Sequence, residues 1–136
     1  MATYYGQGRT NTFAVRDVDA VKAALADYEI EVIERGDSQV TLLANSEDGD
    51  FSVWTFDDEG DTEDSVFIPD MIADHLQDGQ IAVFVHSGWE KMRYMSAWGL
   101  AVHSDGRQIR ISVDDIYAIA AKVFDVDPRL ISIAAY

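Results

Sequence analysis

The stretch QIAVFVHSGWEKMRYMSAWGLAVHSDGRQIRISV, residues 80–113, decides the fold of this chain. Apolar and β-branched residues fill 80–89 and 94–103, which predicts two long strands around a turn at WEKMR. The tight turn SDG at 104–106 then leads into a third strand at 107–113. Strands joined by connections this short run antiparallel, because a parallel pair needs a crossover of a dozen or more residues.

The segments before this stretch predict an alternation of strands and helices. A helix is expected over 16–30, where apolar residues recur at helical spacing and Asp17 can cap the first turn. Strands are expected at 10–15, 31–35, 39–45 and 51–56, and the middle two form a hairpin around GDS. Residues 6–10, GQGRT, are interpreted as a flexible lead-in, because no helix follows them to bind a phosphate.

Two more helices complete the pattern. One is expected over 67–78, with Pro69 near its first turn and Gly79 just past its end. The other is VDDIYAIAAKVF at 113–124, which follows Ser112 as its cap. Its expected buried stripe consists of Ile116, Ile119, Ala120 and Val123, and a docked extended tail follows over 125–136.

The order of these elements predicts a single α+β domain over residues 1–136. We expect a mainly antiparallel sheet of about five to six strands, with three helices packed largely on one face. The N-terminal sequence lacks the layout of a signal peptide, and no apolar run is long enough to span a membrane. A cytoplasmic location, in a bacterial host cell, is the expectation.

The charge of the chain is unevenly distributed. It has 25 acids and 10 bases, for a net charge of −15. No Lys or Arg lies between Arg35 and Lys91, an interval with fourteen acids, whereas the remainder has eleven acids and ten bases. General adaptation to salt should spread acids over the whole surface. A concentrated negative surface instead repels phosphate backbones and anionic membranes, and attracts basic proteins or cations.

The acids of the middle segment form a candidate binding surface. An acidic loop at 57–65 directly precedes the 67–78 helix, whose acids recur at i, i+4 and i+8 and so share one outer side. Folding can therefore join them into one negative face. The candidate partner-binding residues are Asp48, Asp50, Asp57, Asp58, Glu59, Asp61, Glu63, Asp64, Asp70, Asp74 and Asp78.

Several kinds of chemistry are disfavoured by the residue types and their spacing. The absence of cysteine excludes disulfides and thiolate metal sites. EF-hand frames centred on Gly49 or Gly60 fail at positions 1 and 12, and His75, His86 and His103 lack zinc-site spacing. We therefore expect no metal and no cofactor.

Catalysis and direct nucleic-acid binding are also disfavoured. The polar cluster HSGWEKMRY, 86–94, surrounds a predicted hairpin turn, and no Gly-x-Ser-x-Gly elbow is present. The arginines form no basic stripe of the kind that follows a phosphate backbone. No catalytic residue is assigned, and a non-enzymatic protein is the expectation.

Two stretches, YYGQGRTNTFAVRDVDA and the second half from DGQIAVF to YAIAAK, carry a resemblance. Glu90, Lys91, Arg93 and Tyr94 match a Glu-Lys-x-Arg-Tyr pattern, which a Gly/Ala-rich strand, a hairpin and a final helix follow. The chain thereby resembles small, acidic, mostly uncharacterised proteins of bacterial phages, plasmids and integrative elements. The resemblance implies a mobile-element origin, and such elements often carry inhibitors of restriction or CRISPR systems, some of which are DNA mimics.

Charge and resemblance together give the leading hypothesis. The chain is predicted to be a DNA-mimicking inhibitor, anti-CRISPR or antirestriction, that blocks a nucleic-acid-binding groove of a bacterial defence complex. Its expected partner is a basic nucleic-acid-binding protein or a CRISPR or restriction complex; no membrane is expected, and a homodimer is left open. The alternative is a protein–protein interaction module or regulator whose acidic loop serves only solubility.

Overall fold

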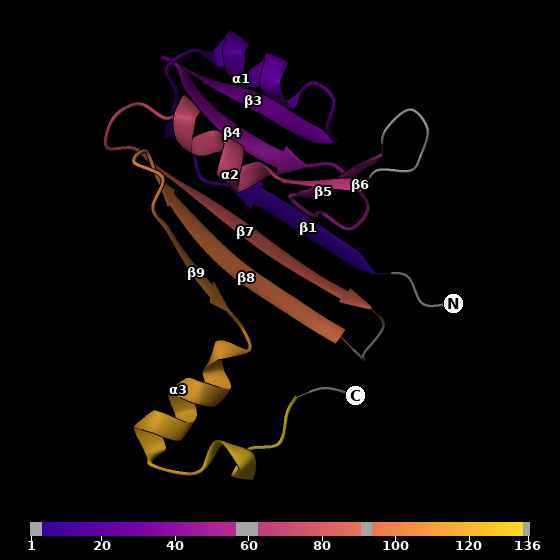
Figure 1. Ribbon diagram of the computed structural model, residues 1–136, viewed down its shortest axis with the longest axis vertical. Helices are drawn as coiled ribbons and strands as arrows, with labels where there is room; N and C mark the ends of the chain where they lie inside the picture. Colours follow the sequence, from indigo (N-terminus) through magenta and orange to yellow (C-terminus); the bar gives the residue numbers. More distant parts are fainter. Residues whose placement is uncertain (1–3, 57–62, 91–93, 135–136) are drawn as a thin grey trace.

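The protein has an α+β fold built on one large antiparallel sheet (Figure 1). The computed structural model describes residues 4–56, 63–90 and 94–134. Within these ranges, seven strands form the main sheet in the order β2-β4-β1-β7-β8-β9, with β3 paired to β4, and β5 and β6 form a separate hairpin. This confirms the predicted fold class. The strands are β1 (Tyr5–Thr10), β2 (Phe13–Ala14), β3 (Ile30–Gly36), β4 (Gln39–Ala44), β5 (Ser52–Phe56), β6 (Glu63–Phe67), β7 (Ile81–Glu90), β8 (Tyr94–His103) and β9 (Gln108–Ser112).

The predicted hairpin of two long strands is confirmed as β7 and β8, which lie between β1 and β9 in the sheet. Its register runs without a break from Ile81 opposite His103 to Glu90 opposite Tyr94. β9 returns along β8 after a tight turn in which Gly106 has a φ of 94°, a conformation that favours glycine. The hairpin of β3 and β4 is also confirmed, and its turn places Gly36, Asp37 and Ser38 at positive φ.

The start of the chain differs from the prediction. Residues 6–10 were expected to be a flexible lead-in, but they belong to β1, which lies between β4 and β7. The strand expected at 10–15 is correspondingly reduced to β2. The prediction was wrong because Gly6 and Gly8 occupy the inward positions of β1, so the usual alternation of large apolar residues is missing.

Two helices cover one face of the sheet, which we call the inner face. α1 (Val18–Leu25) begins at Asp17, whose carboxylate accepts hydrogen bonds from the backbone N–H groups of Asp19 and Ala20, as expected for its cap. α2 (Ile68–Ile72) continues into a 3₁₀ turn, η1 (Ala73–His75). The core between helices and sheet consists of Phe13, Val15, Val21, Leu25, Val40, Leu42, Phe51, Ile68, Ile72, Ala73, Leu76, Ala82, Phe84, Leu100 and Val102.

The second helix is shorter than the sequence predicts. It was expected to reach residue 78, but Leu76 is extended and forms an isolated bridge with Val15. That pairing draws the chain out of the helix and buries Leu76 completely. The acidic loop expected at 57–65 is shorter too, because Glu63–Phe67 forms β6 and pairs with β5.

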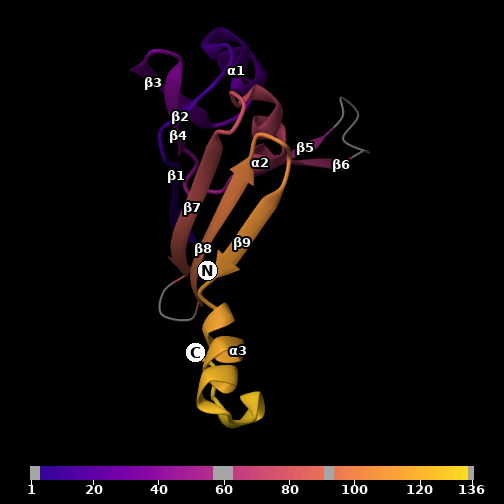
Figure 2. The same cartoon turned by 90° about the vertical axis from the view of Figure 1, so that its left-hand side faces the viewer.

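The third helix, α3 (Asp115–Phe124), projects beyond the end of the sheet (Figures 1 and 2). Asp114, not Ser112, occupies its N-cap position. The expected buried stripe is wrong: Ile116, Ile119 and Val123 are 55%, 54% and 69% exposed, because no sheet lies beneath the helix. None of the described helices is long and apolar enough to cross a membrane.

Candidate protein-interaction surfaces

Four carboxylates surround a hollow beside the hairpin of β3 and β4. Asp27, Glu29, Asp48 and Asp50 line this hollow of about 300 Å³. It forms because Ile30 pairs with Ala44, which brings the segment after α1 against the connection from β4 to β5. In the part of the chain that the structure describes, no ion pair neutralises any of the four. We call the hollow lined by these four carboxylates the acidic hollow.

Two of these carboxylates also shape the connection in which they lie. Asp48 Oδ1 accepts hydrogen bonds from the Ser46 hydroxyl at 2.7 Å and from the backbone N–H of Asp50 at 3.2 Å. Asp50 Oδ1 accepts a hydrogen bond from the backbone N–H of Ser52 at 3.0 Å. Their charge is thus held in place by local turns of the kind that aspartate favours.

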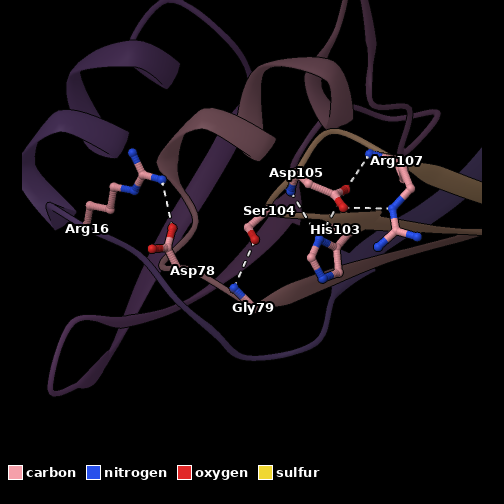
Figure 3. A network of polar contacts seen from close by, with 7 residues as sticks. All are labelled: Arg16, Asp78, Gly79, His103, Ser104, Asp105 and Arg107. Atoms are coloured by element: carbon pink, nitrogen blue, oxygen red, sulfur yellow. Dashed lines mark hydrogen bonds and ion pairs between the residues drawn. The ribbon is translucent and has the colours of Figure 1, made fainter.

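The helical acids do not form the expected single row. Asp70 and Asp74 are exposed on α2 and η1, but Asp78 lies beyond the helical segment. Asp78 accepts a hydrogen bond from the Arg16 guanidinium at 3.3 Å, so its charge is partly balanced (Figure 3). Asp70 accepts a hydrogen bond from Gln108 Nε2 at 2.7 Å, which ties α2 to β9.

The remaining candidate acids are placed only in part. The backbones of Glu63 and Asp64 lie on β6, opposite Phe56 and Thr55 of β5. Asp57, Asp58, Glu59 and Asp61 fall outside the described residues. Among the described side chains, the predicted acidic surface is therefore limited to two places. The first is the acidic hollow, whose 46–50 connection packs on the inner face through Gly49 and His86. The second is Asp70 and Asp74 on α2 and η1, which lie over that face (Figure 1).

The charge pattern alone does not point to Asp27 and Glu29. They lie upstream of Arg35, outside the segment that lacks bases. The signal that could have found them is the predicted hairpin, because pairing 31–35 with 39–45 brings the residues that flank its open end together.

A buried polar cluster holds the 46–50 connection, which lines part of the acidic hollow, against the sheet. His86 on β7 is 6% exposed, and its Nδ1 lies 2.9 Å from the Gly49 carbonyl oxygen. A carbonyl can only accept, so Nδ1 carries the proton and Nε2 accepts from the Tyr4 hydroxyl at 2.8 Å. The His86 ring stacks between Tyr4 and Trp98, and the Arg110 guanidinium lies 5.1 Å from the centre of the Trp98 ring. These contacts give His86 a structural role in holding the 46–50 connection against β7.

Glycines let the chain pass directly over this cluster. A Cβ at Gly6 would lie 2.8 Å from His86 Cε1, and one at Gly8 would lie 2.8 Å from Phe51 Cε2. Gly49 has a φ of 64°, and a Cβ there would lie 2.6 Å from the backbone of Gln7. The glycines of GQGRT thus serve close packing of the Asp48–Gly49 connection on β1.

A polar network fastens the turns at the other end of β7 and β8 (Figure 3). The Ser104 hydroxyl accepts a hydrogen bond from the Gly79 N–H at 2.9 Å. Asp105 accepts from the backbone N–H of Arg107 at 2.9 Å and from its Nε at 2.7 Å. The backbone hydrogen bond from Arg107, together with its charge, holds the pKa of Asp105 below the usual range. These contacts lie at the surface and order the turns.

The other side of the sheet, which we call the outer face, has no helix over β1, β7, β8 and β9 in the described ranges (Figure 2). Its exposed large apolar side chains are Tyr5, Ile81, Val85, Trp89, Met95, Ile109 and Ile111. The pairing register places Val85, Gly99 and Ile111 in one row across the three strands. Between the large residues, Ala97 and Gly99 form the floor of a shallow groove of about 410 Å³.

The C-terminal arm, residues 113–134, is the second apolar surface. It comprises α3, a left-handed turn at Asp125 and the 3₁₀ turn η2 (Pro128–Leu130). The tail folds back until the Ala134 N–H donates to the Tyr117 hydroxyl at 2.7 Å, and only Ala121 of α3 becomes buried. The exposed large apolar residues of the arm are Val113, Ile116, Ile119, Val123, Phe124, Val126, Leu130 and Ile133.

Comparisons with known proteins assign this chain to no group. No protein-family model matches it, and no match was found among the curated proteins or the solved structures. Among the described residues, no group of three or more His, Asp or Glu side chains is arranged to hold a metal ion.

Proposed function

We propose that this protein acts by binding other proteins, and that its acidic side competes with nucleic acid for a basic groove of a bacterial defence complex. The observation that carries this proposal is the acidic hollow, which is lined by Asp27, Glu29, Asp48 and Asp50 without an ion-pair partner among the described residues. Carboxylates held in this way compete with phosphates for lysine and arginine.

Two features support a binding role for this charge. The turns at Asp48 and Asp50 fix two carboxylates by hydrogen bonds, so a partner need not order them. The buried contact between His86 and the Gly49 carbonyl anchors the same connection to the sheet. A rigid cluster of like charge costs folding stability, and binding of a basic partner would offset that cost.

The test uses displacement from DNA. Bacterial lysate is bound to DNA-cellulose at about 0.1 M salt and eluted with this protein at the same salt. Binding of the eluted partner to this protein is then measured at about 0.1 M and about 1 M salt, between which the Debye length falls from about 10 Å to about 3 Å. We expect a defined nucleic-acid-binding protein or complex to be released, and its binding to this protein to weaken steeply at the higher salt. Mass spectrometry of the eluate identifies it.

Matched charge variants control this test. Asp27→Lys with Glu29→Lys reverses two charges in the acidic hollow, whereas Asp19→Lys with Asp114→Lys makes the same change in net charge elsewhere. We expect the first pair to lose displacement and the second to retain it, while both keep the circular dichroism spectrum of the parent. Equal displacement by both pairs would contradict the proposal.

A second candidate is an interaction module that binds through apolar surfaces and uses its acids for solubility. The observation that favours it is the bare outer face together with the arm, which expose fifteen large apolar side chains. Under this alternative, neutralising the acidic hollow leaves partner binding unchanged, and Val85→Asp or Ile109→Asp abolishes it.

A further inference from the structure

We propose that this protein forms a homodimer in which the C-terminal arm of each copy lies in the groove on the outer face of the other copy. All fifteen exposed large apolar residues of the described chain belong either to the outer face or to the arm. In the described chain, the outer face is a sheet surface with no helix packed on it, and the arm contains a helix with no sheet packed against it. Exchange of such an element between identical chains is a common route to symmetric dimers.

The strands themselves indicate that the outer face is covered. The run Ile81–Val85 is apolar at every position, so β7 sends Ala82 and Phe84 inward and Ile81, Val83 and Val85 outward. Continuous apolar runs are typical of strands with both faces buried, whereas a strand with one wet face alternates with polar residues. The inner face is covered by α1 and α2, whereas none of the described segments covers the outer face, so we expect its cover to come from another molecule.

The helix of the arm is short and has few packing contacts within its own chain. α3 is ten residues long, and isolated helices shorter than about 12–15 residues are marginal in water. Its contact with η2 buries little of its apolar side, since Ile119 and Val123 stay more than half exposed. A helix of this length becomes stable when its apolar side is packed against another surface.

The floor of the groove is shaped for such an occupant. A Cβ added at Gly99 would meet Ile111 Cγ1 at 3.8 Å and Phe84 O at 3.9 Å, which are ordinary contacts. Packing within the chain therefore does not require glycine here, and glycine in a strand lowers stability. Small residues at Ala97 and Gly99 keep the groove open between Val85 and Ile111.

The distribution of charge selects a second copy as the occupant. Residues 107–136 contain four bases and four acids and are neutral, so residues 1–106 carry the whole net charge of −15. Two such chains repel each other at long range over most of their surface. The neutral segment, which contains β9 and the arm, is the region through which identical chains can meet with the least repulsion.

The connection between β9 and α3 directs the arm away from its own sheet. Val113 and Asp114 separate the two elements, and the Val113 N–H continues the ladder by donating to the Ala97 carbonyl at 2.8 Å. The Ser112 N–H donates to the Asp115 carboxylate at 2.6 Å. These hydrogen bonds hold α3 in line with β9, so its apolar side reaches another molecule and not the outer face behind it.

Because the chain contains no cysteine, site-specific cross-linking gives a direct test. Ala118→Cys on the arm and Ser87→Cys on the outer face are prepared as separate variants, one with a size tag, and mixed after refolding. Both positions are exposed. We expect a short bis-maleimide to give the mixed product of tagged and untagged chains. Ala23→Cys, an exposed position on α1, replaces Ser87→Cys as the control and should give none.

Three results would overturn the proposal. The first is the absence of a mixed product above the level of the Ala23→Cys control. The second is cross-linking within one chain of the Ala118→Cys/Ser87→Cys double variant, which would place the arm on its own sheet. The third is a protein that sediments as a single chain at high micromolar concentration.

Two further variants separate this arrangement from pairing through the open edge of β9. Gly99→Leu fills the groove, and Ile119→Asp places a charge on the apolar side of the arm. We expect each to raise the dissociation constant of the dimer at least tenfold in sedimentation experiments, with an unchanged near-ultraviolet spectrum. A dimer that survives Gly99→Leu uses another surface, and that result also contradicts the proposal.

Discussion

Phe84 and Val85 are neighbours in β7, yet the first is completely buried and the second is 45% exposed. Phe84 lies on the inner face of the sheet, and Val85 lies on the outer face. The inner face has α1 and α2 over it, whereas the outer face has no cover within the described chain, although it carries seven exposed large apolar side chains. The comparison teaches that two neighbouring residues of similar apolar character differ in burial because only the inner face has helices packed over it in the described chain.

The same division separates the charges. The acidic hollow and α2 lie on the covered side, while β9 and the arm belong to the neutral segment 107–136. A protein of this kind can present a charged side to a basic partner and an apolar side to a second copy. The two proposals are independent, since one concerns side chains that the other does not use.

The largest expected effect comes from the two neighbours in β7. Phe84→Ala removes a buried ring that packs edge-on against Phe51, with 4.9 Å between the ring centroids. We therefore expect a loss of about 3–5 kcal/mol in the free energy of unfolding. Val85→Ala, measured at a concentration where the protein is dilute, should cost no more than about 0.5 kcal/mol. Urea unfolding measures both. Similar losses would mean that the outer face is already packed within the single chain.

The buried histidine should come next. His86→Phe leaves the Gly49 carbonyl and the Tyr4 hydroxyl without their partner, and an unsatisfied buried group costs about 1–3 kcal/mol. Tyr4→Phe removes one hydrogen bond and should cost about 1 kcal/mol. The two variants are compared by thermal and urea unfolding. A larger loss for Tyr4→Phe would contradict the assignment of His86 as the anchor of the 46–50 connection.

Two glycines on opposite faces sharpen the comparison further. Gly8→Ala forces a Cβ against the Gly49 carbonyl and Phe51, so we expect a loss of about 1–3 kcal/mol. Gly99→Ala adds a Cβ with ordinary contacts and should be neutral or stabilising by up to about 1 kcal/mol. Unfolding of both variants at a concentration low enough to keep the chain monomeric tests this. A destabilising Gly99→Ala would show that the groove is filled by its own chain.

The smallest expected effects concern two exposed aspartates. The side chain of Arg129 lowers the pKa of Asp127 in the arm, whereas the backbone N–H of Arg107 is the main cause of the lowered pKa of Asp105. Arg129→Gln should therefore raise the pKa of Asp127 more than Arg107→Gln raises that of Asp105. Carbon-detected NMR titration of the carboxyl groups measures both shifts.

The sign of the pH dependence follows from these lowered pKa values. Since each carboxyl is more acidic in the folded than in the unfolded chain, its contribution to stability is present above the unfolded pKa. It is lost as the pH falls through the folded pKa. An increase in the pKa of either aspartate on folding would contradict the hydrogen bonds to Arg107 and Arg129.

Local pattern predicted most of the elements. The two long strands at 80–89 and 94–103, the hairpin of β3 and β4 and the cap at Asp17 follow from turn chemistry and periodicity, which act between near neighbours. The errors lie where distant segments meet. β1 was missed because its inward residues are glycines that face the 46–50 connection, and the second helix ends early because Leu76 pairs with Val15.

The candidate sites show the same limit. The sequence identified the acid-rich middle of the chain, but Asp27 and Glu29 joined it only through the pairing of Ile30 with Ala44. For α3, helical periodicity correctly predicted an apolar stripe, yet its burial depended on where the helix lies relative to the sheet. Helical periodicity shows which side of a helix is apolar, but it does not show which surface that side packs against.

By itself, the amino-acid sequence determined an α+β chain with an antiparallel sheet, a strong negative charge and a neutral C-terminal segment. Only the tertiary structure decided that helices cover one face of the sheet, that no described segment covers the other, and that α3 projects beyond the end of the sheet. The physical reason is that turns, caps and periodicity depend on residues a few positions apart, whereas covering a face depends on contacts between segments far apart in the chain.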